Sequence, residues 1–275
     1  MKDKDVKKIV KEGYGRIAKG GGSCCGPMKQ CCGQDSAAKK ISKNIGYNEK
    51  EMSSVPEGAN LGLGCGNPVA LAALKEGDTV LDLGSGAGFD AFLAAKKVGD
   101  KGKVIGVDMT PEMIARAKAN ARKANYDNVE FRLGDIEDLP VDNGSIDIII
   151  SNCVINLAPD KRKVFKEAFR VLRTGGRLMV SDLVLTKELP EAVKNSVAGY
   201  LGCLSGAIDE EKYLDAVRMA GFRDVKVIEE TAFPVDYMAN DPTAQALMGD
   251  LKVTQKEIKE VASSVLSIKV SAIKK

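Results

Sequence analysis

Residues 79–90 read Thr79-Val80-Leu81-Asp82-Leu83-Gly84-Ser85-Gly86-Ala87-Gly88-Phe89-Asp90, an apolar strand that runs into a glycine turn and a helix start. Glycines at 84, 86 and 88 let a ligand approach the backbone amides closely. Asp82 stands just before the turn, where a phosphate site would not favour negative charge. Asp108 ends the next expected strand, a placement that suits hydrogen bonds to ribose hydroxyls. This stretch therefore predicts a nucleoside-binding turn.

Strand and helix patterns alternate after this point. Apolar runs predict strands at 79–83, 103–107, 129–132, 146–151 and 177–182. Helical spacing predicts helices at 88–97, 111–124 and 161–172, the last ended by Gly175-Gly176. The alternation predicts an α/β fold with a doubly wound, mostly parallel sheet.

The flanking segments are less regular. We expect a helix at 6–17, an irregular Gly- and Cys-rich stretch at 19–33, and loop structure at 53–68. After residue 182 we expect helices at 188–203, 209–220 and 254–264, and strands at 225–230 and 265–273.

Composition narrows the function classes. The chain has 275 residues, of which 44% are hydrophobic, and no apolar run approaches a membrane span, so we expect no membrane association. The charged N-terminus leads into no hydrophobic signal core, which predicts a cytoplasmic protein. Residues 1–50 carry 12 Lys or Arg and 5 Asp or Glu, a local charge of +7. No aromatic platform or known motif accompanies this charge, so we expect no nucleic-acid binding.

The chain has seven cysteines and no histidine, so its site chemistry must come from sulfur and oxygen. In a reducing cytosol, cysteines indicate metal binding or catalysis rather than structural disulfides. Cys153 follows the strand at 146–151, where it faces whatever the glycine turn holds. With Cys65 and Cys203 it suggests a soft substrate. Trivalent arsenic prefers thiolates, and three would leave its lone pair free to accept a methyl group without a general base.

The region from Asp82 to Gly88, with Asp108, resembles the S-adenosylmethionine-dependent methyltransferases of the Rossmann-like class. The resemblance implies that Asp108 binds the ribose, Met109 packs on the adenine, and Asp135 binds its amine. It also assigns Ile136 and Asn152 to the cofactor site, together with Asp82, Gly84, Ser85, Gly86 and Gly88. We expect the neighbouring Glu137 and Asp138 to lie in a solvated loop. An NAD-binding domain is the alternative reading of the turn.

Three further motifs resemble those of arsenite methyltransferases: Gly64-Cys65-Gly66-Asn67-Pro68, Ser151-Asn152-Cys153-Val154-Ile155-Asn156-Leu157 and Gly199-Tyr200-Leu201-Gly202-Cys203-Leu204-Ser205-Gly206-Ala207. The resemblance implies that Cys153 and Cys203 bind As(III), delivered as arsenite or a thiol conjugate. Cys65 would be the third ligand and a disulfide partner during turnover. Its exchange partner would come from Cys24, Cys25, Cys31 and Cys32, of which we favour Cys32. Thioredoxin or glutathione would then reset the enzyme. Because thiolates bind the arsenic, we expect a local lowering of the thiol pKa values.

These patterns divide the chain into three expected parts. They are a basic arm with its Cys-rich loop at 1–50, an S-adenosylmethionine-binding domain at 51–185, and a C-terminal substrate-binding region at 186–275. We expect a monomer. The alternatives are a C-methyltransferase acting on a quinone-like molecule, and a non-catalytic metalloid-binding protein. The N-terminal cysteines could also hold Zn²⁺ as a Cys₄ site, act as a mobile capture arm, or be disordered. Each cysteine could also simply be buried.

Overall fold

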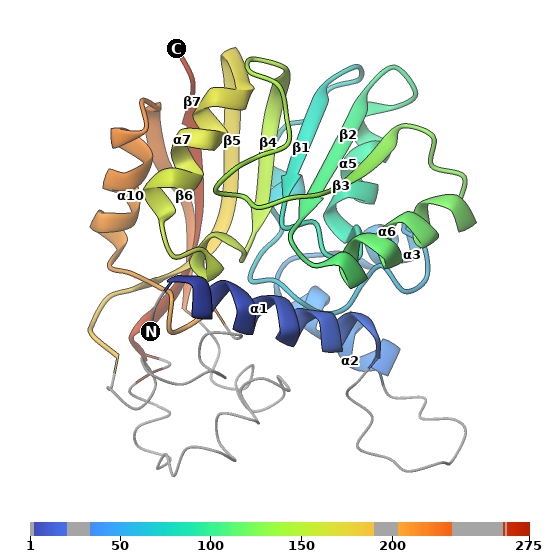
Figure 1. The fold of residues 1–275 in the computed structure, drawn as a ribbon, viewed down its shortest axis with the longest axis horizontal. Coiled ribbons are helices and arrows are strands. Elements are labelled where there is room, and N and C mark those ends of the chain that lie inside the picture. The colour runs from blue at the N-terminus through green and yellow to red at the C-terminus, as the bar shows by residue number, and fades with distance from the viewer. Residues whose placement is uncertain (1–2, 21–33, 190–202, 233–260, 262) are drawn as a thin grey trace.

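The seven strands of the described chain form one sheet in the order β3-β2-β1-β4-β5-β7-β6 (Figure 1). The computed structural model describes residues 3–20, 34–189, 203–232, 261 and 263–275. The strands are β1 (Thr79–Leu83), β2 (Lys103–Asp108), β3 (Val129–Leu133), β4 (Ile146–Asn152), β5 (Leu172–Leu185), β6 (Arg223–Ala232) and β7 (Val265–Ile273). Neighbouring strands from β3 to β5 pair in parallel, and β7 pairs antiparallel with both β5 and β6. The chain builds outward from β1 to β3 and then returns to β4 beside β1. This reversal creates the switch point at which ligands bind in such sheets.

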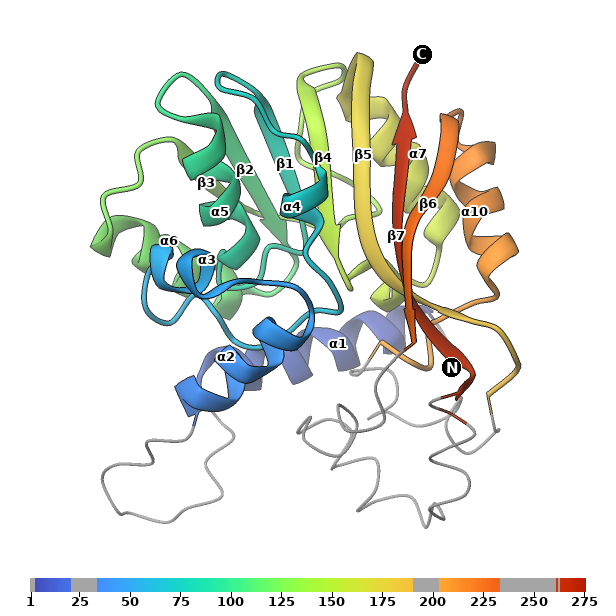
Figure 2. The same cartoon turned by 180° about the vertical axis from the view of Figure 1, so that it is seen from behind.

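Helices cover both faces of the sheet (Figures 1 and 2). The helices α4 (Pro68–Leu71), α5 (Phe89–Val98) and α6 (Pro111–Lys123) pack on one face. The other face carries α7 (Lys161–Val171) and α10 (Glu210–Met219). Burial on both faces explains why β4 has an almost unbroken run of isoleucines. Each such side chain contributes roughly 1.5–3 kcal/mol when fully buried.

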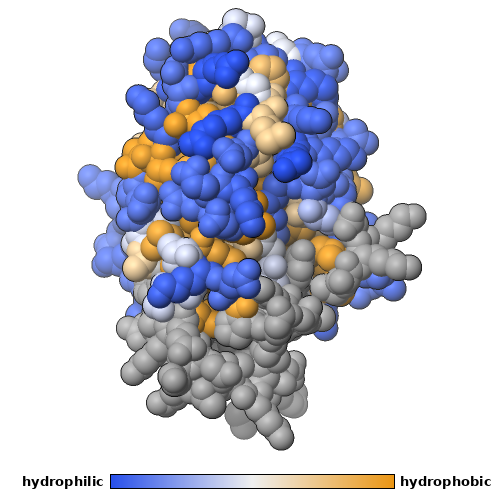
Figure 3. Space-filling view, turned by 90° about the vertical axis from the view of Figure 1, so that its left-hand side faces the viewer, coloured by the Kyte–Doolittle hydropathy of each residue, from blue (hydrophilic) through white to orange (hydrophobic). Residues whose placement is uncertain are grey.

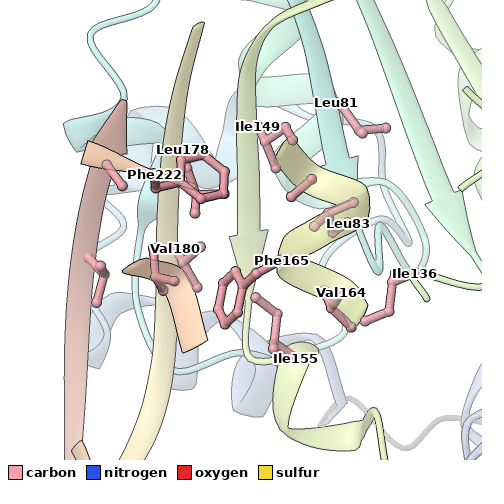
Figure 4. Close-up of a cluster of buried hydrophobic side chains, with 14 of the residues drawn as sticks. Leu81, Leu83, Ile136, Ile149, Ile155, Val164, Phe165, Leu178, Val180 and Phe222 are labelled. Atoms are coloured by element: carbon pink, nitrogen blue, oxygen red, sulfur yellow. The ribbon is translucent and has the colours of Figure 1, made fainter. Parts of the chain in front are cut away.

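Side chains alternate between the two faces along each strand. Val80 joins the core under α5, whereas Leu81 and Leu83 join the core under α7. Figure 4 shows this second core, in which Val164 and Phe165 from α7 pack toward the sheet. The buried β1 therefore holds the glycine turn that follows it in a fixed position.

Four further elements surround the carboxyl ends of the parallel strands. They are α1 (Asp3–Ala18), α2 (Gln34–Asn44), α3 (Glu49–Ser54) and the 3₁₀ helix η1 (Ile155–Leu157). Both ribbon views show α1 crossing below this end of the sheet. Arg116 on α6 donates to the carbonyl of Ala18 at 3.0 Å, which ties the end of α1 to the body of the fold. Helix α1 thus lies where the sheet opens its ligand crevice.

The structure confirms the predicted doubly wound α/β sheet, and it differs from the sequence reading in four places. Gly175-Gly176 does not end a helix, because α7 ends at Val171 and the glycines lie inside β5, next to a register shift. Neither α2 nor α3 was expected, and the last two residues of α3 overlap the loop expected at 53–68. Cys203 lies in a turn with φ +61° rather than in a helix. Most of the helices expected at 188–203 and 254–264 falls outside the described residues.

The strands β6 and β7 extend the same sheet as β1–β5. The three-part division of the chain remains a prediction. Figure 3 shows the side that carries α10 and β6, where hydrophilic residues are interrupted by apolar patches. Among the large apolar side chains exposed in the described chain are Met219 of α10 and Ile228 of β6. None of the helices described is both long and apolar enough for a bilayer crossing.

Candidate active site

A pocket lies at the carboxyl ends of β1, β2 and β4, with α1 over it. Its lining includes nearly all the residues predicted to bind the cofactor: Asp82, Gly84, Ser85, Gly86, Asp108, Met109, Asp135, Ile136 and Asn152. The same pocket is lined by Cys65, Cys153 and Cys203. The topology has therefore brought the two predicted sets of residues to one place.

The three glycines of the turn are needed for different reasons. Gly84 has φ +67°, and a Cβ there would lie 2.3 Å from Cγ2 of Val154. Gly88 has φ +98° and begins α5, where a Cβ would lie 2.6 Å from the ring of Phe92. Gly86 has φ +52°, and a Cβ would meet nothing within 4 Å. Gly86 therefore borders open space in the pocket, while Gly84 and Gly88 serve close packing.

Two polar atoms beside the turn have no protein partner within the described chain. They are Oδ2 of Asp82 and Oγ of Ser85, and both are buried. Burial raises the pKa of Asp82 well above its ordinary value, and the charges of Asp90 and Asp108 raise it further. Buried polar groups in native proteins are rarely left unpaired. A polar ligand in the pocket would supply the missing partners.

The carboxylate of Asp108 is held by the turn and by its own loop. Its Oδ2 accepts a hydrogen bond from the Gly86 amide at 3.0 Å, and its Oδ1 accepts one from the Thr110 amide at 2.8 Å. Both bonds orient the carboxylate at the end of β2. Burial is nevertheless the larger influence, and it raises the pKa of Asp108.

Lys7 of α1 reaches the acidic loop that follows β3. Its Nζ lies 2.6 Å from Oδ2 of Asp135 and 2.7 Å from Oε2 of Glu137. The Glu137 residue is only 6% exposed, and its Oε1 accepts from the Asp160 amide at 2.9 Å. The expectation of a solvated Glu137 is therefore wrong, because the side chain ties α1 to the start of α7. Asp138 is exposed, as expected.

Asn152, at the end of β4, connects the loop that carries Cys65 to the segment that follows the glycine turn. Its Oδ1 accepts from the Cys65 amide at 3.0 Å, and its Nδ2 donates to the Gly66 carbonyl at 2.8 Å. The same Nδ2 donates to Oδ2 of Asp90 at 3.0 Å, and Tyr47 donates to the other oxygen of that carboxylate. Burial is the main cause that raises the pKa of Asp90 to about 6. Sequence reasoning missed Tyr47 and Asp90, since only the fold brings them to Asn152.

The three cysteine thiols meet at one side of the pocket. The sulfurs of Cys65 and Cys153 lie within 4.8 Å of each other, and the Cys203 thiol donates to the Cys153 carbonyl at 2.8 Å. They sit in a third apolar cluster, to which α1 contributes Val6 and Val10. All three are free thiols. The fold thus brings together Cys65 and Cys153, about 90 positions apart in sequence, and Cys203, about 50 positions further on.

Two of these cysteines have a strained backbone. Cys153 has φ +58° and Cys203 has φ +61°, in the left-handed region that residues with side chains seldom adopt. Such strain costs roughly 1–3 kcal/mol and concentrates at functional sites. The backbone strain therefore marks Cys153 and Cys203 as candidate functional residues, independently of their thiol chemistry.

The thiol pKa values do not follow the expected lowering. Hydrogen bonding to Cys203 and Cys65, together with burial, holds the pKa of Cys153 well above its ordinary value. Burial is the main cause that raises the pKa of Cys65. The expectation is wrong because an apolar cluster penalises each thiolate, and neighbouring thiols add repulsion. Without a ligand these two thiols keep their protons at neutral pH.

Asp182 is a further buried acid beside the thiols that sequence reasoning missed. It is 0% exposed, and an oxygen of its carboxylate lies within 4.8 Å of the sulfurs of Cys65 and Cys153. Burial raises the pKa of Asp182 to about 7. Its available signal was an acid at the end of the strand expected at 177–182, the same kind of signal that drew attention to Asp108, although β5 continues past Asp182 to Leu185. The N-terminal cysteines, including Cys32, lie outside the described residues.

Comparisons with known proteins show the family to which the chain belongs. A family model described as a methyltransferase domain matches residues 74–221. The chain is 45% identical to an arsenite methyltransferase of Halobacterium salinarum, over 89% of this chain and 65% of that protein. It is 34% identical to an arsenite methyltransferase of Homo sapiens, over 81% of this chain and 59% of that protein.

A solved structure is also similar. The crystal structure of an arsenic (III) S-adenosylmethionine methyltransferase from Chlamydomonas reinhardtii matches with a TM-score of 0.63 and 32% identity, covering 86% of this chain and 73% of that one. The resemblance inferred from the cysteine motifs is thereby confirmed. This chain spans 59–65% of the length of the two curated relatives.

Proposed function

Because this chain belongs to the methyltransferase-domain family, we propose that it methylates trivalent arsenic, with S-adenosylmethionine as the methyl donor. The observation that carries the proposal is the meeting of Cys65, Cys153 and Cys203 in the pocket that the glycine turn lines. The high identity to arsenite methyltransferases supports the same substrate.

The residues of the turn fit a nucleoside-bearing donor. Gly86 leaves room beside it, and Asp82 and Ser85 offer buried polar atoms that lack protein partners in the described chain. Asp108 would bind the ribose, while Met109, Asp135 and Ile136 would surround the adenine. When bound, S-adenosylmethionine supplies an electrophilic methyl group. The Asp135 carboxylate now accepts a hydrogen bond from Lys7. To accept one from the adenine amine as well, it would have to bind both groups or release Lys7.

The cysteines would hold arsenic as three sulfur ligands. Each exchange forms one S–As bond and breaks one As–O bond of arsenite, or one As–S bond of a thiol conjugate. The thiol proton leaves with the released hydroxide or thiolate, as water or free thiol. The raised pKa values of Cys65 and Cys153 suit this route, because binding then removes protons without ever leaving bare thiolates in an apolar cluster.

Methylation raises arsenic formally from the trivalent to the pentavalent state, so two electrons must restore it. We propose that Cys65 and an N-terminal cysteine, Cys32 by preference, supply them by forming a disulfide. Thioredoxin or glutathione would reduce that disulfide. We further propose a cytoplasmic monomer that acts without nucleic acid or membrane, with the C-terminal part of the chain forming the substrate region.

The test is arsenic speciation after incubation with S-adenosylmethionine, arsenite and a thiol. We expect methylated arsenic from the intact chain and a loss of roughly 100-fold or more from Cys153→Ser and from Cys203→Ser, since each removes a ligand. Unchanged binding of S-adenosylmethionine by these variants is the control for an intact pocket. Wild-type methylation by either variant would refute the three-thiolate site. Turnover of a quinone without arsenite, or arsenite binding with no methylated product, would favour one of the two rival functions.

A further inference from the structure

Arsenic methylation as proposed leaves one polar group of the thiol cluster unused. Asp182 is fully buried, yet an oxygen of its carboxylate and the sulfurs of Cys65 and Cys153 all lie within 4.8 Å of one another. An As(III) ion held by three thiolates is already neutral and needs no carboxylate. A hard oxygen ligand beside two soft sulfur ligands instead suits a borderline cation.

Neutral donors hold the carboxylate in place. Asn156 Nδ2 and the Leu183 amide each donate to Oδ1 of Asp182 at 2.9 Å, and the Tyr213 hydroxyl donates to Oδ2 at 3.1 Å. A carboxylate offers about four lone-pair positions, so these three bonds leave acceptor capacity for a cation. Partners of this kind orient metal-binding carboxylates in known sites.

We propose that Cys65, Cys153 and Asp182 bind a thiophilic divalent cation of the Zn²⁺ type, with the fourth position open toward Cys203. In a tetrahedral site with Zn–S bonds of about 2.3 Å, neighbouring sulfurs are separated by about 3.8 Å. The observed limit of 4.8 Å means that the ligand atoms need only small shifts to close on an ion. Binding would release the two thiol protons to solvent.

The charge of such a site is nearly balanced. Two thiolates and one carboxylate around a divalent ion leave a single negative charge. Lys161 is only 9% exposed, and its positive charge acts on both Asp182 and Cys203. An ammonium in that position offsets the remaining charge. The site is thus suited to a dication, whereas a neutral three-thiolate arsenic complex gains little from either group.

This site has a consequence that rests on the proposed function. Zn²⁺ and As(III) would use the same two sulfurs, so Zn²⁺ would inhibit arsenic methylation competitively. The binding itself does not depend on that activity. Its test can therefore succeed or fail whatever the chain methylates.

The experiment uses the full chain with Cys24, Cys25, Cys31 and Cys32 changed to Ser, so that only the three pocket cysteines remain. Titration with ZnCl₂ at pH 8, where Asp182 with a pKa of about 7 is already largely ionised, under a non-thiol reductant should show one ion per chain and release of about two protons per ion. Asp182→Asn should weaken Zn²⁺ binding at least about tenfold, since loss of even an outer partner of a ligand costs roughly 10–100-fold. The exposed Asp142→Asn is the matched control and should bind like its parent.

Zinc X-ray absorption on the four-serine chain gives a readout that needs no change at Asp182. We expect oxygen at about 2.0–2.2 Å together with sulfur at about 2.3 Å. An all-sulfur shell, unaltered affinity in Asp182→Asn, or failure of Zn²⁺ to bind stoichiometrically would each overturn the proposal. Absence of arsenite methylation by the unaltered chain, with Zn²⁺ binding intact, would instead refute only the proposed function.

Discussion

Replacing Asn152 with Ala should both destabilise the fold and loosen the loop that carries Cys65. The change removes the acceptor of the Cys65 amide and the donor to the Gly66 carbonyl. Each buried backbone group left unpaired costs about 1–3 kcal/mol. Allowing for some access by water, we expect the free energy of unfolding to fall by about 3 kcal/mol. Cys65 should also lose its position, which would weaken arsenite binding.

Asn152→Asp sharpens this prediction because it keeps the acceptor for Cys65 but removes the donors. It also adds a carboxylate beside Asp90, whose pKa of about 6 makes it charged at pH 8 and largely neutral at pH 5. The variant should therefore lose more stability at pH 8 than at pH 5. Urea unfolding at the two pH values measures both variants.

Asn128→Ala is the matched control. Its Nδ2 donates to the Ala95 and Gly99 carbonyls, away from the pocket. This control should lose stability without losing affinity for arsenite or S-adenosylmethionine. The reasoning is refuted if Asn152→Ala unfolds within about 0.5 kcal/mol of the parent, the scatter of ordinary surface changes. A loss for Asn152→Asp that is equal at both pH values would contradict the charge argument.

Three further outcomes are expected. Gly86→Ala should keep the fold at a cost of about 1–2 kcal/mol, because its backbone is left-handed. The added methyl group would enter the pocket. Calorimetry should therefore show weaker binding of S-adenosylmethionine, and an unchanged affinity would contradict this prediction. The folded pKa of Asp182 is raised to about 7, so its stabilising effect is complete below about pH 4 and is lost as pH rises toward 7. Between pH 4 and 7 the unfolding free energy of Asp182→Asn should therefore fall less than that of the parent, by up to about 4 kcal/mol. If urea unfolding gives the variant the same pH dependence as the parent, the raised pKa of Asp182 is refuted. Lys7→Met removes the ion pairs to Asp135 and Glu137, which are worth about 1 kcal/mol at a partly exposed site. Proteolysis within residues 3–20 should become faster in this variant. An unchanged cleavage rate would show that other contacts hold α1.

Local sequence patterns were enough to predict the parallel part of the sheet and the glycine turn. The pattern from β1 to β5 was readable because buried parallel strands need unbroken apolar runs, and because glycines mark a turn that approaches a ligand. Cys153 could be located for the same reason, since it directly follows such a strand. These features depend on neighbours within a few residues, so local spacing carries them.

The surroundings of the sulfur atoms come from contacts between segments that are distant along the chain. Asp182 meets the thiols because β5 lies beside β4, and Lys7 meets Asp135 because α1 crosses the open end of the sheet. The direction of the thiol pKa values was also misread from sequence. Burial and like neighbours set a pKa, and both arise from segments distant along the chain. Such long-range contacts have no periodicity or spacing to reveal them before the chain has folded.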